Sequence, residues 1–204
     1  MSKRFILIVA ILFAMFAGMQ TKAACPTPPD CPSDTWTTVT VTTNINGCTV
    51  TYTYCHRIAC GVWKDLYLDK ITFGFGCSPF TGSYDINDLI TDIQKQILYS
   101  NPWGGAGLPP CPTMSAPQYR FYAGTCYYEC KITDYVEIRW CNPEALCYEI
   151  YKACNGAGGP TGWTGVEIEV ISRGTWGACY EKVADCDCDG TPEQKVKTCI
   201  TRCN

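Results

Sequence analysis

Apolar and polar residues alternate almost strictly between Trp36 and Cys55, in the segment WTTVTVTTNINGCTVTYTYC. At its centre lies Asn46-Gly47, the residue pair that a two-residue type I′ turn prefers. The segment is therefore predicted to be a β-hairpin in which Ile45 lies opposite Cys48 and the pairing continues outward from there. This register collects the apolar residues on one face and the polar residues on the other, so turn chemistry and hydrophobic pattern agree.

The polar face of this hairpin is a ladder of threonines, with Thr40 opposite Thr53 and Thr42 opposite Thr51. Such a flat hydroxyl surface suits a carbohydrate or an ordered layer of water, and it is also the ordinary composition of an exposed strand face. The 13 Tyr and 6 Trp residues also fit two interpretations, one functional and one structural. They favour either a platform on which a sugar or a protein stacks, or the filling of a thin β core.

One segment, 86–99, has a clear helical period. The apolar residues at helical spacing are Ile86, Leu89, Ile90, Ile93 and Ile97. Asp85 is a favourable N-cap, and Asn101-Pro102 ends the pattern. The spacing therefore predicts a single amphipathic helix with one face toward a core.

Further runs of alternating or β-branched residues predict additional strands. They are 66–75, 118–122, 125–131, 134–141, 147–154 and 166–172, the last two joined as a hairpin over the glycine-rich loop 155–165. The fold class is therefore a mainly β, disulfide-rich, antiparallel β-sheet protein with one amphipathic helix. A Gly/Pro loop at 102–112 is the best boundary between two subdomains, 24–101 and 113–204, although 24–204 also fits a single domain.

Residues 1–23 have the features of a secretory signal peptide. Lys3-Arg4 precedes an apolar run at 5–18, and small residues at 21 and 23 suit a cleavage site. As a helix this run rises about 21 Å, which is less than the roughly 30 Å of a membrane's hydrocarbon core. We therefore expect a secreted, extracellular protein, in a bacterium at the periplasm or cell surface, with no transmembrane segment in the mature chain.

Composition narrows the class of protein further. Charged residues make up only 17% of the chain and aromatic residues 13%, which excludes intrinsic disorder. The net charge of −3 and the acidic isoelectric point argue against a nucleic-acid partner.

Cysteine is the most informative residue type, with 17 in the chain and none before residue 25. The cysteines are Cys25, Cys31, Cys48, Cys55, Cys60, Cys77, Cys111, Cys126, Cys130, Cys141, Cys147, Cys154, Cys179, Cys186, Cys188, Cys199 and Cys203. At this density, and behind an export signal, we expect about eight structural disulfides rather than metal or redox sites. No Cys-x-x-Cys pair occurs, which excludes thioredoxin-like and c-type haem motifs.

Because 17 is odd, one cysteine lacks a partner within the chain. It is a buried free thiol, a bridge to another chain such as a second copy, or a lipidated Cys25. Lys22 stands where a lipidation motif has an aliphatic residue, so the third choice is disfavoured. An exposed thiol is a liability in an oxidising compartment, which favours the first two.

The segment 185–191, DCDCDGT, resembles the first half of a calcium loop of the EF-hand type. Its candidate ligands are Asp185, Asp187, Asp189 and Thr191. Val196 stands where that loop has its bidentate glutamate, so the predicted Ca²⁺ site is incomplete and structural rather than catalytic. The alternative is a solvated acidic turn held by its two cysteines; no other cofactor is expected.

Catalytic residues are scarce in the sequence. His56 is the one histidine, and no Gly-x-Ser-x-Gly motif is present. Glu167 and Glu169 lie about 7 Å apart along one predicted strand, a spacing near that of a glycosidase pair, but such acids usually form a wet outer face. We therefore expect a non-enzymatic structural or cell-surface protein that self-associates through strand edges or an intermolecular disulfide. The alternative is an extracellular binding module for a glycan or a protein.

Overall fold

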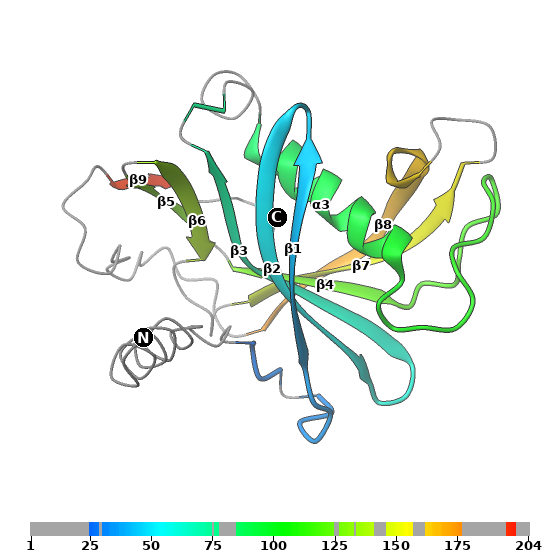
Figure 1. The fold of residues 1–204 in the computed structure, drawn as a ribbon. Coiled ribbons are helices and arrows are strands. Elements are labelled where there is room, and N and C mark those ends of the chain that lie inside the picture. The colour runs from blue at the N-terminus through cyan, green and yellow to red at the C-terminus, as the bar shows by residue number, and fades with distance from the viewer. Residues whose placement is uncertain are drawn as a thin grey trace, which may run out of the picture.

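The structure, a computed structural model, describes residues 25–28, 30–74, 76–77, 85–124, 127–132, 134–140, 146–156, 162–176 and 195–198. These residues form nine strands, an α-helix and a short 3-10 helix (Figure 1). The strands are β1 (Thr37–Ile45), β2 (Cys48–Ala59), β3 (Trp63–Gly74), β4 (Tyr119–Gly124), β5 (Tyr127–Ile132), β6 (Tyr135–Trp140), β7 (Leu146–Asn155), β8 (Val166–Trp176) and β9 (Lys195–Thr198). The helices are α3 (Ile86–Ser100) and η1 (Trp163–Gly165). The predicted mainly β fold with one amphipathic helix is confirmed.

The β1–β2 hairpin has the predicted turn and the predicted register. Asn46 and Gly47 both adopt positive φ, 52° and 83°, as the two central residues of a type I′ turn must. Ile45 pairs with Cys48, and the antiparallel ladder continues from there to the start of β1 without a shift. Local turn chemistry and the alternating pattern therefore determine this part of the fold together.

Strand β3 is the centre of the sheet, because it pairs with three other strands. β2 runs antiparallel along one of its edges, with one register shift at Thr53/Tyr54. Along the other edge, β4 pairs with residues 64–67 and β6 with residues 70–74. The sheet then continues in two branches, β4–β7–β8 and β6–β5–β9.

The β3–β4 pair is parallel, whereas the sequence pattern predicts antiparallel pairs throughout. The reason is the connection, since α3 and the loop 102–112 carry the chain back across the sheet before β4 begins, and parallel neighbours need such a crossover. The other strand pairs are antiparallel, including the predicted β7–β8 hairpin. The short strand β9 has no counterpart among the sequence predictions.

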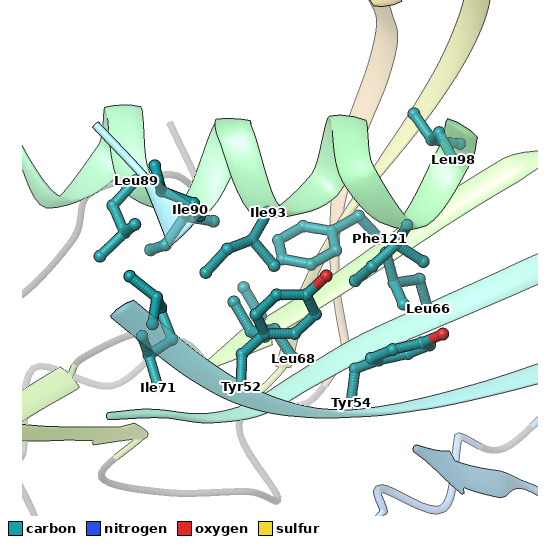
Figure 2. Packing of buried hydrophobic residues seen from close by; sticks show 14 of the residues in the cluster. Tyr52, Tyr54, Leu66, Leu68, Ile71, Leu89, Ile90, Ile93, Leu98 and Phe121 are labelled. Atoms are coloured by element: carbon teal, nitrogen blue, oxygen red, sulfur yellow. The ribbon is translucent and has the colours of Figure 1, made fainter. Parts of the chain in front are cut away.

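Helix α3 lies along one face of the sheet and closes the main core (Figures 1 and 2). The Asp85 side chain accepts a hydrogen bond from the backbone N–H of Asn87 at 2.9 Å, and Asn101 ends the helix with a left-handed φ of 47°. Figure 2 shows the apolar side of the helix facing large side chains of β2, β3 and β4. The labelled residues are Tyr52, Tyr54, Leu66, Leu68, Ile71, Leu89, Ile90, Ile93, Leu98 and Phe121. The predicted helix, its cap and its apolar face are thus confirmed.

Candidate functional site

One edge of strand β1 pairs with no other strand among the described residues, and it is the first candidate surface for an interaction. In the part of the chain that the structure describes, β1 pairs with β2 alone. It is nine residues long, TTVTVTTNI, with no charged residue and no proline, and its ladder with β2 has no bulge. Natural sheets usually protect an edge with lysine, proline, a bulge or a very short strand. β1 has none of these devices.

The turn decides which backbone groups of β1 face outward. The residues that flank a two-residue type I′ turn, Ile45 and Cys48, exchange both backbone hydrogen bonds, and such pairs alternate along an antiparallel ladder. The odd-numbered residues of β1 therefore bond to β2, and the even-numbered residues direct their N–H and C=O groups away from it. These outward residues are Thr38, Thr40, Thr42 and Asn44.

The other edge strands differ from β1. β8, which also has one neighbour among the described residues, exposes Glu167, Glu169 and Arg173, and its ladder with β7 shifts register at Ile150/Tyr151. β9 is only four residues long, and two of them are lysine. Charge, irregular register and shortness are the usual protections of an edge, so β1 is the least protected of the three.

The threonine ladder on the outer face of the β1–β2 hairpin is formed as predicted. The hydroxyl oxygens of Thr40 and Thr53 lie 3.0 Å apart, and those of Thr42 and Thr51 lie 2.9 Å apart. Thr40 and Thr42 are exposed, whereas Thr51 and Thr53 are half-buried. The hydroxyls therefore hydrogen-bond to each other across the strands and remain within reach of solvent on the β1 side.

Charged side chains continue this polar surface on β3 and β6. Lys70 lies beside Thr53 in the β2–β3 register, and Arg139 of β6 lies beside Lys70. Glu137 pairs with both cations, at 3.5 Å between its Oε2 and the Lys70 Nζ and in closer contact with the Arg139 Nε. Because Glu137 is itself buried, the two cations supply the ionic partners that a buried carboxylate requires.

A second, buried charge group crosses three strands on the face opposite α3. Arg57 of β2, Asp65 of β3 and Arg120 of β4 are register partners, with exposed fractions of 4%, 0% and 5%. The Arg57 Nε donates to the Asp65 Oδ2 at 3.0 Å. The Arg120 Nε and Nη2 donate to the two Asp65 carboxylate oxygens at 2.6 and 2.8 Å. Asp65 is therefore held by two guanidiniums, one of them in a bidentate pair.

The N-terminal arm, residues 25–36, covers this charge group. The Arg57 guanidinium donates to the carbonyls of Asp30 at 3.3 Å and Cys31 at 3.1 Å, and the Asp30 carboxylate pairs with Arg120. The Arg57 guanidinium carbon also lies 4.7 Å from the centre of the Trp36 ring. The arm thus supplies a second carboxylate, carbonyl acceptors and an aromatic face to cations that are out of contact with water.

Burial and pairing act against each other in this group. Burial raises the pKa of Asp65, and the hydrogen bonds and charges of Arg120 and Arg57 partly offset that rise. For Arg120 burial acts to lower the pKa, but the hydrogen bonds to Asp65 and Asp30 outweigh it and raise the pKa. The ionised forms are therefore stabilised by each other rather than by solvent.

Two disulfides fasten the arm to β2 and to the residue that follows it. Cys25 is bonded to Cys55, and Cys31 to Cys60, with sequence separations of 30 and 29. The Asp34 carboxylate also accepts a hydrogen bond from the backbone N–H of Cys60 at 2.6 Å. Both attachments lie on the β2 side, so the arm clamps the outer face of the sheet.

Replacing Cys31 and Cys60 together by serine is expected to lower the free energy of unfolding by about 2–4 kcal/mol, because the unfolded chain regains the freedom of a closed loop. Chemical denaturation of the oxidised protein measures the loss. Limited proteolysis followed by mass spectrometry should also show faster cleavage in residues 25–36. The matched change at Cys111 and Cys154, a disulfide with a sequence separation of 43, should destabilise to a similar extent without exposing the arm. An unchanged denaturation midpoint would contradict the clamp.

The His56 side chain packs against aromatic rings. Its ring is half-buried on the helix side of β2, with ring centres 5.9 Å from Tyr54 and 6.1 Å from Trp103. Burial lowers the pKa of His56, so the neutral imidazole is favoured there. The Trp103 Nε1 donates to the backbone carbonyls of Arg57 and Asp65 at 3.0 and 3.2 Å, which fixes the ring that contacts His56.

The other residues singled out from the sequence are placed as follows. Glu167 and Glu169 are both exposed on β8. The predicted calcium ligands at 185–191 lie outside the described residues. Expected disulfides are present as Cys25–Cys55, Cys31–Cys60, Cys48–Cys77 and Cys111–Cys154, and Cys130 and Cys147 are also disulfide-bonded. The remaining seven cysteines lie outside the described residues.

Two clusters within the described residues bring three metal-ligating side chains together. They are Cys31, Asp34 and Cys60, and Cys111, Cys154 and Glu167. In each cluster the two cysteines are bonded to each other, so their sulfurs are not available as thiolate ligands.

The Arg57–Asp65–Arg120 group is the feature that the sequence pattern did not reveal. A signal was present for two of the three residues, because Arg57 alternates with Cys55 and Ala59 along β2, and Asp65 alternates with Trp63 and Tyr67 along β3. No described helix combines the length and apolar character required to cross a membrane.

Comparisons with models of protein families, with curated proteins and with solved structures find no match to the chain.

Proposed function

We propose that this chain is a secreted, non-enzymatic structural or cell-surface protein that associates with copies of itself through the free edge of β1. The observation that carries the proposal is the edge itself, nine uncharged residues without proline, bulge or other protection. A sheet edge of this kind pairs readily with another strand. An edge that is left unprotected in a highly crosslinked protein is best explained as a surface through which the protein associates.

The rest of the molecule supports such a role by being rigid around β1. The hairpin that carries β1 is bonded to the arm through Cys25–Cys55 and, through Cys48–Cys77, to a residue that follows β3. The inner face of β1 contributes Val39 and Val41 to the main core. A preformed strand loses little conformational freedom when it pairs, so more of the pairing energy remains for association.

Replacing Thr42 by proline tests this proposal. The N–H of Thr42 points away from β2, so proline removes an outward donor while the bonds between β1 and β2 remain. We expect sedimentation equilibrium of the oxidised, mature protein to show self-association of the wild type. The dissociation constant of the proline variant should rise by at least about tenfold, because ladder bonds are lost in both copies.

The matched control is Thr42→Ala, which removes the same hydroxyl but keeps the N–H, and which should associate as the wild type does. A wild type that stays monomeric at all concentrations, or a proline variant that associates normally, would contradict the proposal. The interpretation as a glycan- or protein-binding module stays a prediction based on the threonine ladder.

A further inference from the structure

We infer that the partner of β1 is β1 of a second copy, in an antiparallel pair whose two-fold axis lies between the two Val41 residues. This inference rests on the proposed function and specifies its geometry. It makes the assembly a closed dimer with a continuous sheet across both copies, because pairing consumes the same edge in each molecule.

Charge favours this occupant. β1 carries no charge, so two copies of it lie side by side without repulsion. Pairing β1 with the β8 edge instead would lay it against a strand that carries Glu167, Glu169 and Arg173, for which β1 offers no opposite charges. The arm crosses the outer face rather than the free edge: its disulfides and ion pairs go to β2, to Cys60 and to β4, and the Cys25 Sγ lies 3.4 Å from the side-chain hydroxyl of Thr38 near the start of β1.

The length and phase of β1 select the register. The strand runs from Thr37 to Ile45, so Val41 is its middle residue, and an axis there pairs the whole strand with its counterpart. In this register Thr40 lies opposite Thr42 of the second copy, and Thr38 lies opposite Asn44. These are the residues whose N–H and C=O groups point outward, so each of them completes its backbone hydrogen bonds. Moving the axis by one residue leaves an end of the strand unpaired.

The side chains agree with the same register on both faces. On the outer face threonine meets threonine across the axis, as it does already between Thr40 and Thr53. On the inner face the two Val41 side chains meet at a non-hydrogen-bonded position, where opposing side chains approach most closely. Val41 is half-buried in the single chain and lies beside the core, so this contact extends the core from one copy to the next.

Complementary charges at Val41 test the register directly. In the inferred dimer Val41→Lys places two lysines opposite each other, and Val41→Asp places two aspartates opposite each other. Each variant alone should therefore raise the dimer dissociation constant at least about tenfold. An equimolar mixture should recover association, because lysine then faces aspartate. Sedimentation velocity measures the dimer, and circular dichroism verifies that each variant is folded.

Two matched pairs of variants serve as controls. Thr43→Lys places a lysine opposite the apolar Val39 of the second copy and should therefore weaken the dimer. Adding the Thr43→Asp variant should not recover association, whereas adding the Val39→Asp variant should, because an aspartate then faces the lysine. Val170→Lys, at a residue of the β8 edge that is 39% exposed, should leave the dimer intact.

The possible outcomes distinguish this inference from the proposed function, self-association, on which it rests. A wild type that dimerises, with recovery only for residues that face each other across Val41, supports the two-fold pair. A wild type that associates without recovery in the Val41 mixture, or that forms an open series of larger species, overturns the two-fold pair but leaves self-association standing. A wild type that is monomeric throughout overturns both.

Discussion

Replacing Asp65 by asparagine is expected to lower the free energy of unfolding by about 3–5 kcal/mol, the usual cost of removing one partner from a buried ion pair. The side chain is fully buried and accepts hydrogen bonds from Arg57 and from both Nε and Nη2 of Arg120. Without its charge two guanidiniums stay buried with only Asp30 to balance them. Urea denaturation of the oxidised protein measures the effect.

The control for this change is Glu169→Gln, which removes an exposed carboxylate from β8 and should alter stability by less than about 0.5 kcal/mol. A combined replacement of Asp65 by leucine and of Arg57 and Arg120 by methionine should recover much of the lost stability, because the three most buried charges are removed together and the Asp30 side chain that remains is 31% exposed. An Asp65→Asn protein as stable as the wild type would show that water solvates this group and that it is not a buried ion-pair cluster.

The folded protein is expected to lose stability steeply as the pH rises above 10. Burial is the largest cause of a raised pKa for Tyr52, Tyr67, Tyr122 and Tyr151, whose ordinary value is 10.0. The neutral phenols are therefore kept in the folded state but ionise on unfolding. Their contribution to stability is complete below pH 10 and is lost as the pH rises toward their folded-state pKa values. Above pH 10 each of these tyrosines lowers the free energy of unfolding by about 1.4 kcal/mol per pH unit, so the four together lower it by about 5 kcal/mol per pH unit.

The phenolate absorbance that belongs to the buried tyrosines should then rise in one step together with the loss of the circular dichroism signal, and both should reverse at neutral pH. Tyr151→Phe is the matched variant, since the Tyr151 hydroxyl is buried without a hydrogen-bond partner among the described residues. It should reduce the slope by about one quarter, the share of one of four tyrosines. Phenolate absorbance that rises to completion while the circular dichroism signal of the fold persists would contradict the burial of these hydroxyls.

The parts of the fold that the sequence predicts are those specified by nearby residues. Asn46-Gly47 defines the hairpin because the required positive φ values belong to those two residues. Helix α3 follows from Asp85 and from the apolar spacing within fifteen residues. In both cases the interacting residues are close in sequence, so the pattern carries the information.

The charge cluster and the free edge depend on distant residues. Asp65 meets Arg57 across 8 positions but Arg120 across 55, and only after the chain has crossed over to place β4 parallel to β3. No local pattern specifies that crossover. A similar limit applies to β1, because the alternation in TTVTVTTNI shows which face is buried but not whether a second neighbour lies along its outer edge.

The long reach of the arm has a consequence for the order of folding. The chain is synthesised from its N-terminus, so the arm, β1, β2 and β3 are available before β4. At that stage Arg57 can meet Asp30 and Asp65, giving two acids for one cation, and the cluster carries an excess of negative charge. The balancing guanidinium of Arg120 follows Asp30 by 90 positions. Docking of β4 is therefore expected to be the late, slow step that completes the outer face, as contacts of such sequence separation generally are.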